Sequence, residues 1–122
     1  MSGRSLTDLK IAAYQTALSK GWYASDSAMP EDSYNSLRQA SSIALMHSEL
    51  SEALEEIRAN LQVNEVYYED DGKPCGVPSE LADVIIRILD FSGRWNIDIE
   101  KIVEEKMQYN SRRSYRHGNK VL

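Results

Sequence analysis

The chain has little of several features that mark particular kinds of protein. Its 122 residues include one cysteine, Cys75, which excludes a disulfide framework and favours a reducing, cytosolic setting. No apolar run approaches the length of a membrane span, and the N-terminal residues lack the apolar segment of a signal peptide. We therefore expect a single cytoplasmic domain with a modest core and no membrane partner.

Basic charge is scarce over most of the chain. The net charge is −5, but residues 106–122 contain five Lys or Arg and no acid, so residues 1–105 carry −10. Nucleic-acid binding depends on a basic surface, so this acidic body argues against it. An acidic region followed by a basic segment is better suited to a phosphate ligand that is chelated by a metal.

Strand-like alternation is also nearly absent, and its longest stretch covers residues 66–68. The spacing of apolar residues instead predicts four helices, at about 6–18, 34–61, 79–95 and 98–112. Ser5 and Asp8 have the spacing of a capping box, Pro78 suits a helix entry, and Asp98 can cap the last helix. We expect an all-α bundle of four to five helices in one domain, residues 1–122, with a basic C-terminal segment at 106–122.

The helix expected at 79–95 is apolar over much of its circumference. Its apolar residues are Leu81, Val84, Ile85, Ile86, Ile88, Leu89 and Phe91. A helix of this kind is covered from several sides, and four short helices in one chain offer too little cover. The pattern therefore predicts a homo-oligomer, either a dimer or a tetramer, that completes the bundle.

Two acidic pairs are the most informative feature of the sequence. Glu49 and Glu52 lie in one expected helix, and Glu80 and Asp83 lie at the start of the next. A three-residue step puts both members of a pair on one helix face. If the two faces meet, four carboxylates converge, and they require a counter-cation because like charges in close contact oppose ionisation. Hard divalent cations such as Mg²⁺ prefer such oxygen ligands.

Histidine is absent where a di-iron site would need it. A di-iron carboxylate bundle normally uses Glu-x-x-His on two helices, and neither His47 nor His117 follows a glutamate by three residues. We interpret His47 instead as a packed residue at the edge of the core.

The helix expected at 98–112 and one aromatic residue suggest how a ligand is held. The inward line of this helix begins as Ile99, Ile102 and Val103 and continues as Lys106, Asn110 and Arg113. Charges on an inward line are costly unless they meet an anion, and triphosphate oxygens would serve. Trp22 is a candidate platform for stacking a base, although such a residue also commonly covers the edge of a core.

These motifs resemble the MazG-like all-α nucleoside triphosphate pyrophosphohydrolases, particularly their small phage and bacterial members. The resemblance starts from Glu49-x-x-Glu52, a gap of 27 residues, and Glu80-x-x-Asp83. Further stretches in the same order are KGW at 20–22, HSELSEALE at 47–55, GVPSELAD at 76–83, EKMQYN at 105–110 and YRHG at 115–118.

The resemblance implies hydrolysis of a nucleoside or deoxynucleoside triphosphate to the monophosphate and pyrophosphate, in the host cytoplasm if the protein is phage-encoded. It assigns Mg²⁺, with Mn²⁺ as a substitute, to four ligands, and a catalytic role in activating water to Glu49 or Glu52. The implied ligands are Glu49, Glu52, Glu80 and Asp83, and the implied phosphate-binding residues are Lys106, Asn110 and Arg113. Close phage relatives often favour deoxyguanosine triphosphate, so the resemblance implies a purine deoxynucleotide such as dGTP as the substrate. Trp22, the aromatic platform named above, is our candidate for the base-binding residue.

The chain departs from the family motif at one position, and two alternative functions remain open. The family motif has two consecutive acids where this chain has Ser48 and Glu49, and Glu56 is a candidate replacement for the missing acid. The first alternative is a non-catalytic helical module that binds nucleotides or regulates a partner. The second is an activity of the phosphoribosyl-ATP pyrophosphohydrolase type on a similar bundle.

Overall fold

A computed structural model describes residues 3–24 and 31–113, with side chains of the second helix from Tyr34 onwards. It contains the helices α1 (Leu6–Ser19), α2 (Glu31–Arg58), α3 (Val77–Arg94) and α4 (Ile99–Ser111). A short antiparallel hairpin pairs β1 (Tyr67–Tyr68) with β2 (Pro74–Cys75). None of the described helices is both long enough and apolar enough to cross a membrane.

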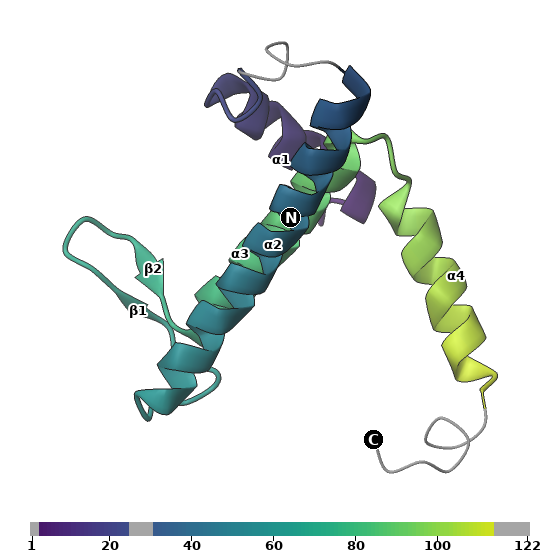
Figure 1. Ribbon diagram of the computed structural model, residues 1–122. Coiled ribbons are helices and arrows are strands. Elements are labelled where there is room, and N and C mark those ends of the chain that lie inside the picture. Colours follow the sequence, from purple (N-terminus) through teal and green to yellow (C-terminus); the bar gives the residue numbers. More distant parts are fainter. Residues whose placement is uncertain (1–2, 25–30, 114–122) are drawn as a thin grey trace.

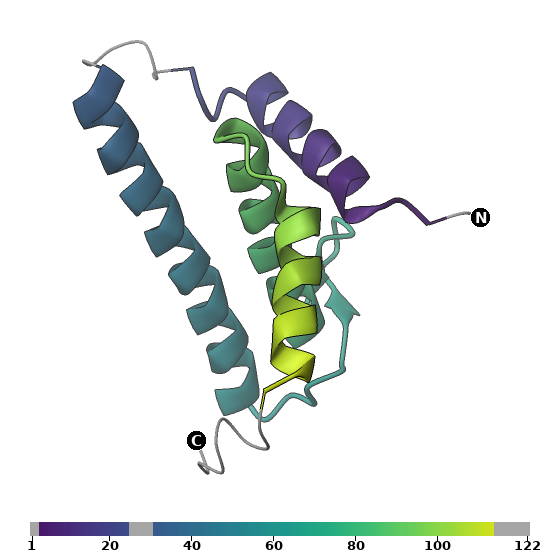
Figure 2. The ribbon, with the colours of Figure 1, turned by 90° about the vertical axis from the view of Figure 1, so that its right-hand side faces the viewer.

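The body of the molecule is the antiparallel pair α2 and α3, which run side by side with the hairpin at the end where α2 leads into α3 (Figure 1). Helix α1 packs on α3, and α4 leaves the far end of α3 and diverges from the α2–α3 pair (Figures 1 and 2). The root of α4 is held by α1: Lys10 Nζ donates to the Ile97 carbonyl at 3.2 Å, and the Thr7 amide donates to Glu100 Oε1 at 3.3 Å. The structure is thus mostly helical, as the sequence predicts.

Local signals account for the helix starts. Ser5 and Asp8 form the predicted capping box, in which each side chain accepts from the other residue's backbone amide at 3.0 Å. Asp98 caps α4 by accepting from the Lys101 amide at 3.3 Å. Helix α3 follows Gly76, whose φ of 109° favours glycine. A Cβ at this position would also collide with the Glu65 carbonyl oxygen.

The α1–α3 contact depends on a second glycine. A Cβ at Gly93 would overlap the side chain of Tyr14, so its absence lets the two helices approach closely. The residues buried within the described chain are few and mostly small. They are Ala17, Ala53, Cys75, Gly76, Val77, Val84 and Leu89, with Glu49 and Ser92 as the polar members.

Several apolar faces remain exposed in the single chain. On α3 they include Ile85 at 52% exposure and Ile86 at 51%, and no residue of α4 is buried. The expectation that His47 packs into the core is wrong within one chain, because it lies on the exposed side of α2. Helix α2 also begins three residues earlier and ends three residues earlier than predicted. Residues 114–122 of the predicted basic segment lie outside the described part of the chain.

Candidate metal and nucleotide site

The two acidic pairs face each other across the α2–α3 interface. Because the chain reverses direction between these helices, a residue late in α2 meets a residue early in α3. Glu52 accordingly lies beside Glu80, while Glu49, one turn earlier, meets the part of α3 that carries Asp83 and Arg87.

Three carboxylates form a tight cluster. Glu49, Glu52 and Glu80 each offer an oxygen, and these three oxygens lie within 4.8 Å of one another. Glu49 is buried, Glu80 is half-buried and Glu52 is exposed, so the cluster opens to solvent on one side. Three such carboxylates could hold a metal ion, since hard cations bind carboxylate oxygens from several side chains and fill the remaining positions with water.

Glu80 shows that the cluster fits a cation. Burial, a hydrogen bond with Glu52 and the charge of that carboxylate raise the pKa of Glu80 from 4.5 to about 7, with further contributions from Asp83 and Glu49. Its Oε2 atom is buried and has no hydrogen-bond partner among the described residues. A buried acceptor without a donor is unfavourable, and a cation bound by the three carboxylates would satisfy it.

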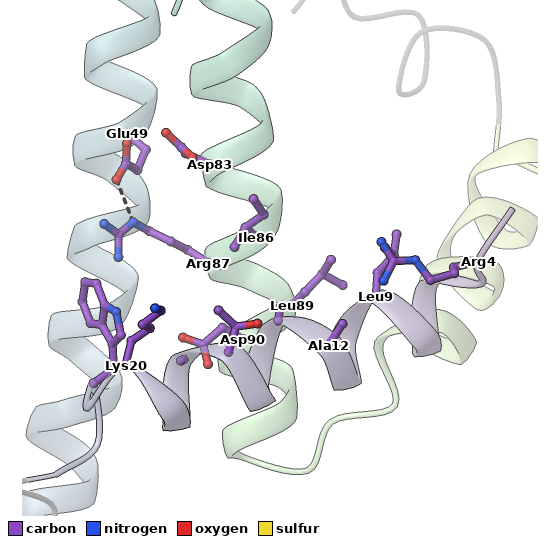
Figure 3. Close-up of a pocket in the computed structure, with 14 residues that line it drawn as sticks. Arg4, Leu9, Ala12, Lys20, Glu49, Asp83, Ile86, Arg87, Leu89 and Asp90 are labelled. Carbon is purple, nitrogen blue, oxygen red and sulfur yellow. Dashed lines mark hydrogen bonds and ion pairs between the residues drawn. The ribbon is translucent and has the colours of Figure 1, made fainter. Parts of the chain in front are cut away.

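Asp83, the fourth predicted ligand, lies beside this cluster rather than within it. Its side chain points towards Glu49 (Figure 3), and both residues line the same pocket. Partial burial and the charge of Glu49 raise the pKa of Asp83, whereas the Arg87 guanidinium opposes the rise. Asp83 therefore shares the electrostatic environment of the cluster.

The candidate replacement for the missing family acid does not reach the site. Glu56 accepts from the Tyr67 hydroxyl, at 3.1 Å to Oε1 and 3.2 Å to Oε2. This contact ties the carboxylate to the hairpin, and Glu56 is not a member of the cluster formed by Glu49, Glu52 and Glu80.

A pocket of about 600 Å³ extends from Glu49 and Asp83 between α1 and α3 (Figure 3). Its wall is apolar where α1 meets α3, and three cationic side chains border it: Arg4, Lys20 and Arg87. Trp22 also lines the pocket, with 47% of its surface exposed. The pocket thus offers an aromatic face and several cations next to the acidic cluster, a combination suited to an anionic aromatic ligand.

A polar network fixes the segment that carries Trp22. The hydroxyl of Tyr23 donates to Asp90 Oδ1 at 2.9 Å, and Arg38 donates to the Trp22 carbonyl at 2.8 Å. The Arg38 and Arg94 guanidinium groups lie 5.0 and 5.3 Å from the Tyr23 ring centroid. Burial raises the pKa of Asp90, while the Tyr23 hydroxyl and the charges of Arg38 and Arg87 oppose that rise.

The predicted phosphate-binding residues lie elsewhere in the single chain. Lys106, Asn110 and Arg113 are all exposed and do not line the pocket. The Lys106 ammonium and the Arg113 guanidinium instead lie 5.4 and 5.9 Å from the Tyr109 ring centroid. The structure of the single chain does not bring these three residues to the pocket, so their role in binding phosphate stays a prediction.

The pocket residue whose partner sequence reasoning missed is Arg87, which pairs with Glu49. Its spacing places it on the acidic face of α3, but no motif indicates its partner.

Comparisons of the chain with models of protein families, with curated proteins and with solved structures found no match. The MazG-like resemblance therefore stays a prediction.

Proposed function

We propose that this protein hydrolyses a nucleoside or deoxynucleoside triphosphate to the monophosphate and pyrophosphate, with Mg²⁺ as cofactor and Mn²⁺ as a substitute. The observation that carries the proposal is the cluster of Glu49, Glu52 and Glu80 at the edge of a pocket that contains Trp22. The MazG-like motifs point to the same reaction. They also favour a purine deoxynucleotide, such as dGTP, as the substrate.

The residues around the pocket would have different roles in this reaction. Glu49, Glu52 and Glu80, with Asp83 beside them, would hold Mg²⁺, which when bound acidifies a coordinated water and screens phosphate charge. Glu49 or Glu52 would orient the attacking water. Trp22 would stack on the base, and the cations that border the pocket would bind phosphate oxygens and stabilise the charge that develops on the leaving pyrophosphate.

A second copy of the chain completes the proposed site. Apolar side chains remain exposed on α3 and on α4, including Leu81, Ile85, Ile102 and Met107. Contact between these faces in a dimer or tetramer would remove them from water. The same contact would bring the basic end of α4 to the acidic cluster of a neighbouring chain, which would place Lys106, Asn110 and Arg113 near the phosphates.

The test of the reaction is an assay of all common NTPs and dNTPs with Mg²⁺ that resolves pyrophosphate from orthophosphate. We expect pyrophosphate and a monophosphate from one or two substrates. Glu49→Gln and Asp83→Asn should abolish turnover with the helical circular dichroism unchanged. Glu55→Gln is the matched control, because Glu55 pairs with Arg58 on the exposed side of the same helix. Orthophosphate as the product would overturn the cleavage site, and binding without hydrolysis would favour the regulatory module.

The shared site is tested by mixing two inactive variants. If Glu52 of one chain and Arg113 of another serve one site of a dimer, Glu52→Gln and Arg113→Ala protomers are each inactive alone. After unfolding and refolding of an equal mixture, about a quarter of the wild-type activity should return, because half of the dimers are mixed and each has one intact site. Absence of recovery in a mixture whose mass confirms dimers would place both residues in the same chain's site.

A further inference from the structure

Arg87 joins the acidic cluster to the aromatic platform. Its Nε donates to Glu49 Oε1 at 2.7 Å, with the two side chains 28% and 11% exposed. Its guanidinium carbon lies 5.2 Å from the ring centroid of Trp22. The short distance and the limited exposure mark a strong, charge-assisted hydrogen bond, and Figure 3 shows the Arg87 side chain reaching from α3 to Glu49 on α2.

This arrangement puts two cations in competition for one carboxylate. Glu49 is also a member of the cluster whose oxygens lie within 4.8 Å of one another. While Arg87 holds Glu49, it supplies the positive charge that a divalent ion would supply. An ion bound at the cluster would therefore repel the guanidinium and weaken its hold on Glu49.

The pocket offers Arg87 a second partner. The side chain borders the cavity between α1 and α3, as do Lys20 and Trp22, so a ligand in the cavity can reach it. A guanidinium is a planar fork whose paired N–H groups match phosphate oxygens, and it can stack on an indole at the same time. Arg87 can thus turn from Glu49 to a phosphate while its guanidinium stays on one face of Trp22, and a base would then stack on the opposite face.

We propose, building on the function proposed above, that Arg87 exchanges partners during binding. Without metal, Arg87 neutralises the Glu49 carboxylate and holds the acidic cluster and the Trp22 ring at fixed positions relative to each other. When a divalent cation occupies the cluster, Arg87 releases Glu49 and binds a phosphate of the nucleotide stacked on Trp22. The exchange makes metal and triphosphate bind cooperatively. A bound metal frees the Arg87 guanidinium for a phosphate, and a phosphate that holds Arg87 leaves the Glu49 carboxylate free to bind the metal.

The exchange predicts effects of opposite sign from one substitution. In Arg87→Met, which keeps an unbranched apolar stem but removes the guanidinium and its charge, Mn²⁺ alone should bind about tenfold more tightly, because no competing cation holds Glu49. A non-hydrolysable nucleoside triphosphate analogue in saturating Mn²⁺ should bind about tenfold more weakly, because its phosphate loses a partner. The loss of analogue affinity separates the exchange from a fixed ion pair, because a guanidinium that stayed on Glu49 would not bind the phosphate.

Isothermal titration calorimetry of the full-length protein measures both affinities. Arg87→Gln provides a second uncharged variant if Arg87→Met fails to fold, and thermal unfolding checks both. Arg58→Gln is the matched control, because Arg58 forms an exposed pair with Glu55 on α2 and should leave both affinities unchanged. Wild-type protein that binds Mn²⁺, with folded Arg87 variants that bind it no more tightly, would overturn the exchange alone. Wild-type protein that binds no Mn²⁺ would overturn the exchange and the proposed metal site together.

Discussion

The pKa of Glu80 leads to a stability prediction that can be worked through in detail. Raising this pKa from 4.5 to about 7 costs about 3 kcal/mol when the group is ionised at pH 8. Because Glu80 is only partly buried, solvent screening reduces this to about 1.5 kcal/mol. With a raised pKa, the stabilising contribution is complete below pH 4.5 and is lost as the pH rises through about 7.

We therefore expect Glu80→Gln to be more stable than the wild type at pH 8 without metal, by about 1.5 kcal/mol, and to show no such gain at pH 4. Addition of Mg²⁺ at pH 8 should reverse the order, since metal at 100 times its Kd stabilises the wild type by about 2.7 kcal/mol and the variant has lost a ligand. Urea unfolding at pH 4 and pH 8 in EDTA, and at pH 8 in Mg²⁺, measures these differences in the free energy of unfolding. The control variant Glu55→Gln should have the stability of the wild type in every condition. A variant that is less stable than the wild type at pH 8 in EDTA would refute the electrostatic reasoning.

Three further substitutions test the packing and the pocket. Gly93→Ala should destabilise the fold by about 1–3 kcal/mol in thermal or urea unfolding, because the new methyl group meets Tyr14. Alanine normally favours a helix, so an unchanged stability would mean that α1 does not pack this closely on α3. Trp22→Ala should weaken nucleotide binding in calorimetry by about 1–3 kcal/mol, and Trp22→Phe should retain most of the affinity. Equal losses of affinity in the two variants would show that Trp22 does not stack on the base. Tyr23→Phe should cost about 1–2 kcal/mol in urea unfolding because Asp90 loses its hydroxyl donor, and a neutral result would show that this hydrogen bond does not stabilise the fold.

Local chemistry explains why so much of the fold could be predicted from the sequence. The capping residues Ser5, Asp8 and Asp98 act within a few residues of their own position, so their spacing determines where helices start. The acidic pairs could be placed on helix faces for the same reason, because a helix has one period throughout. Their meeting across α2 and α3 required in addition that the two helices pack antiparallel in the register that the structure shows.

Contacts between distant residues were less accessible to sequence reasoning. The period places Arg87 on the acidic face of α3, but its bond to Glu49 depends on the axial register of two helices, which the sequence of neither one determines. The apolar stripes posed a similar difficulty, because a stripe indicates that a face avoids water without indicating what covers it. His47 and the inward line of α4 were interpreted as facing the chain's own core, but the structure leaves His47 exposed, and it leaves every residue of that line after Ile99 exposed.

The antiparallel pairing of α2 and α3 has a consequence for how this protein tolerates insertions and deletions. Residues 69–73 form the exposed connection between the two short strands, where added residues would be accommodated by a longer loop. A single residue deleted from α3 between Glu80 and Arg87 would instead rotate everything beyond it by about 100° and shift it by about 1.5 Å. Asp83 or Arg87 would then leave the interface while Glu80 stayed. Loop length can therefore vary among functional variants, whereas the number of residues between the acidic positions of a helix cannot.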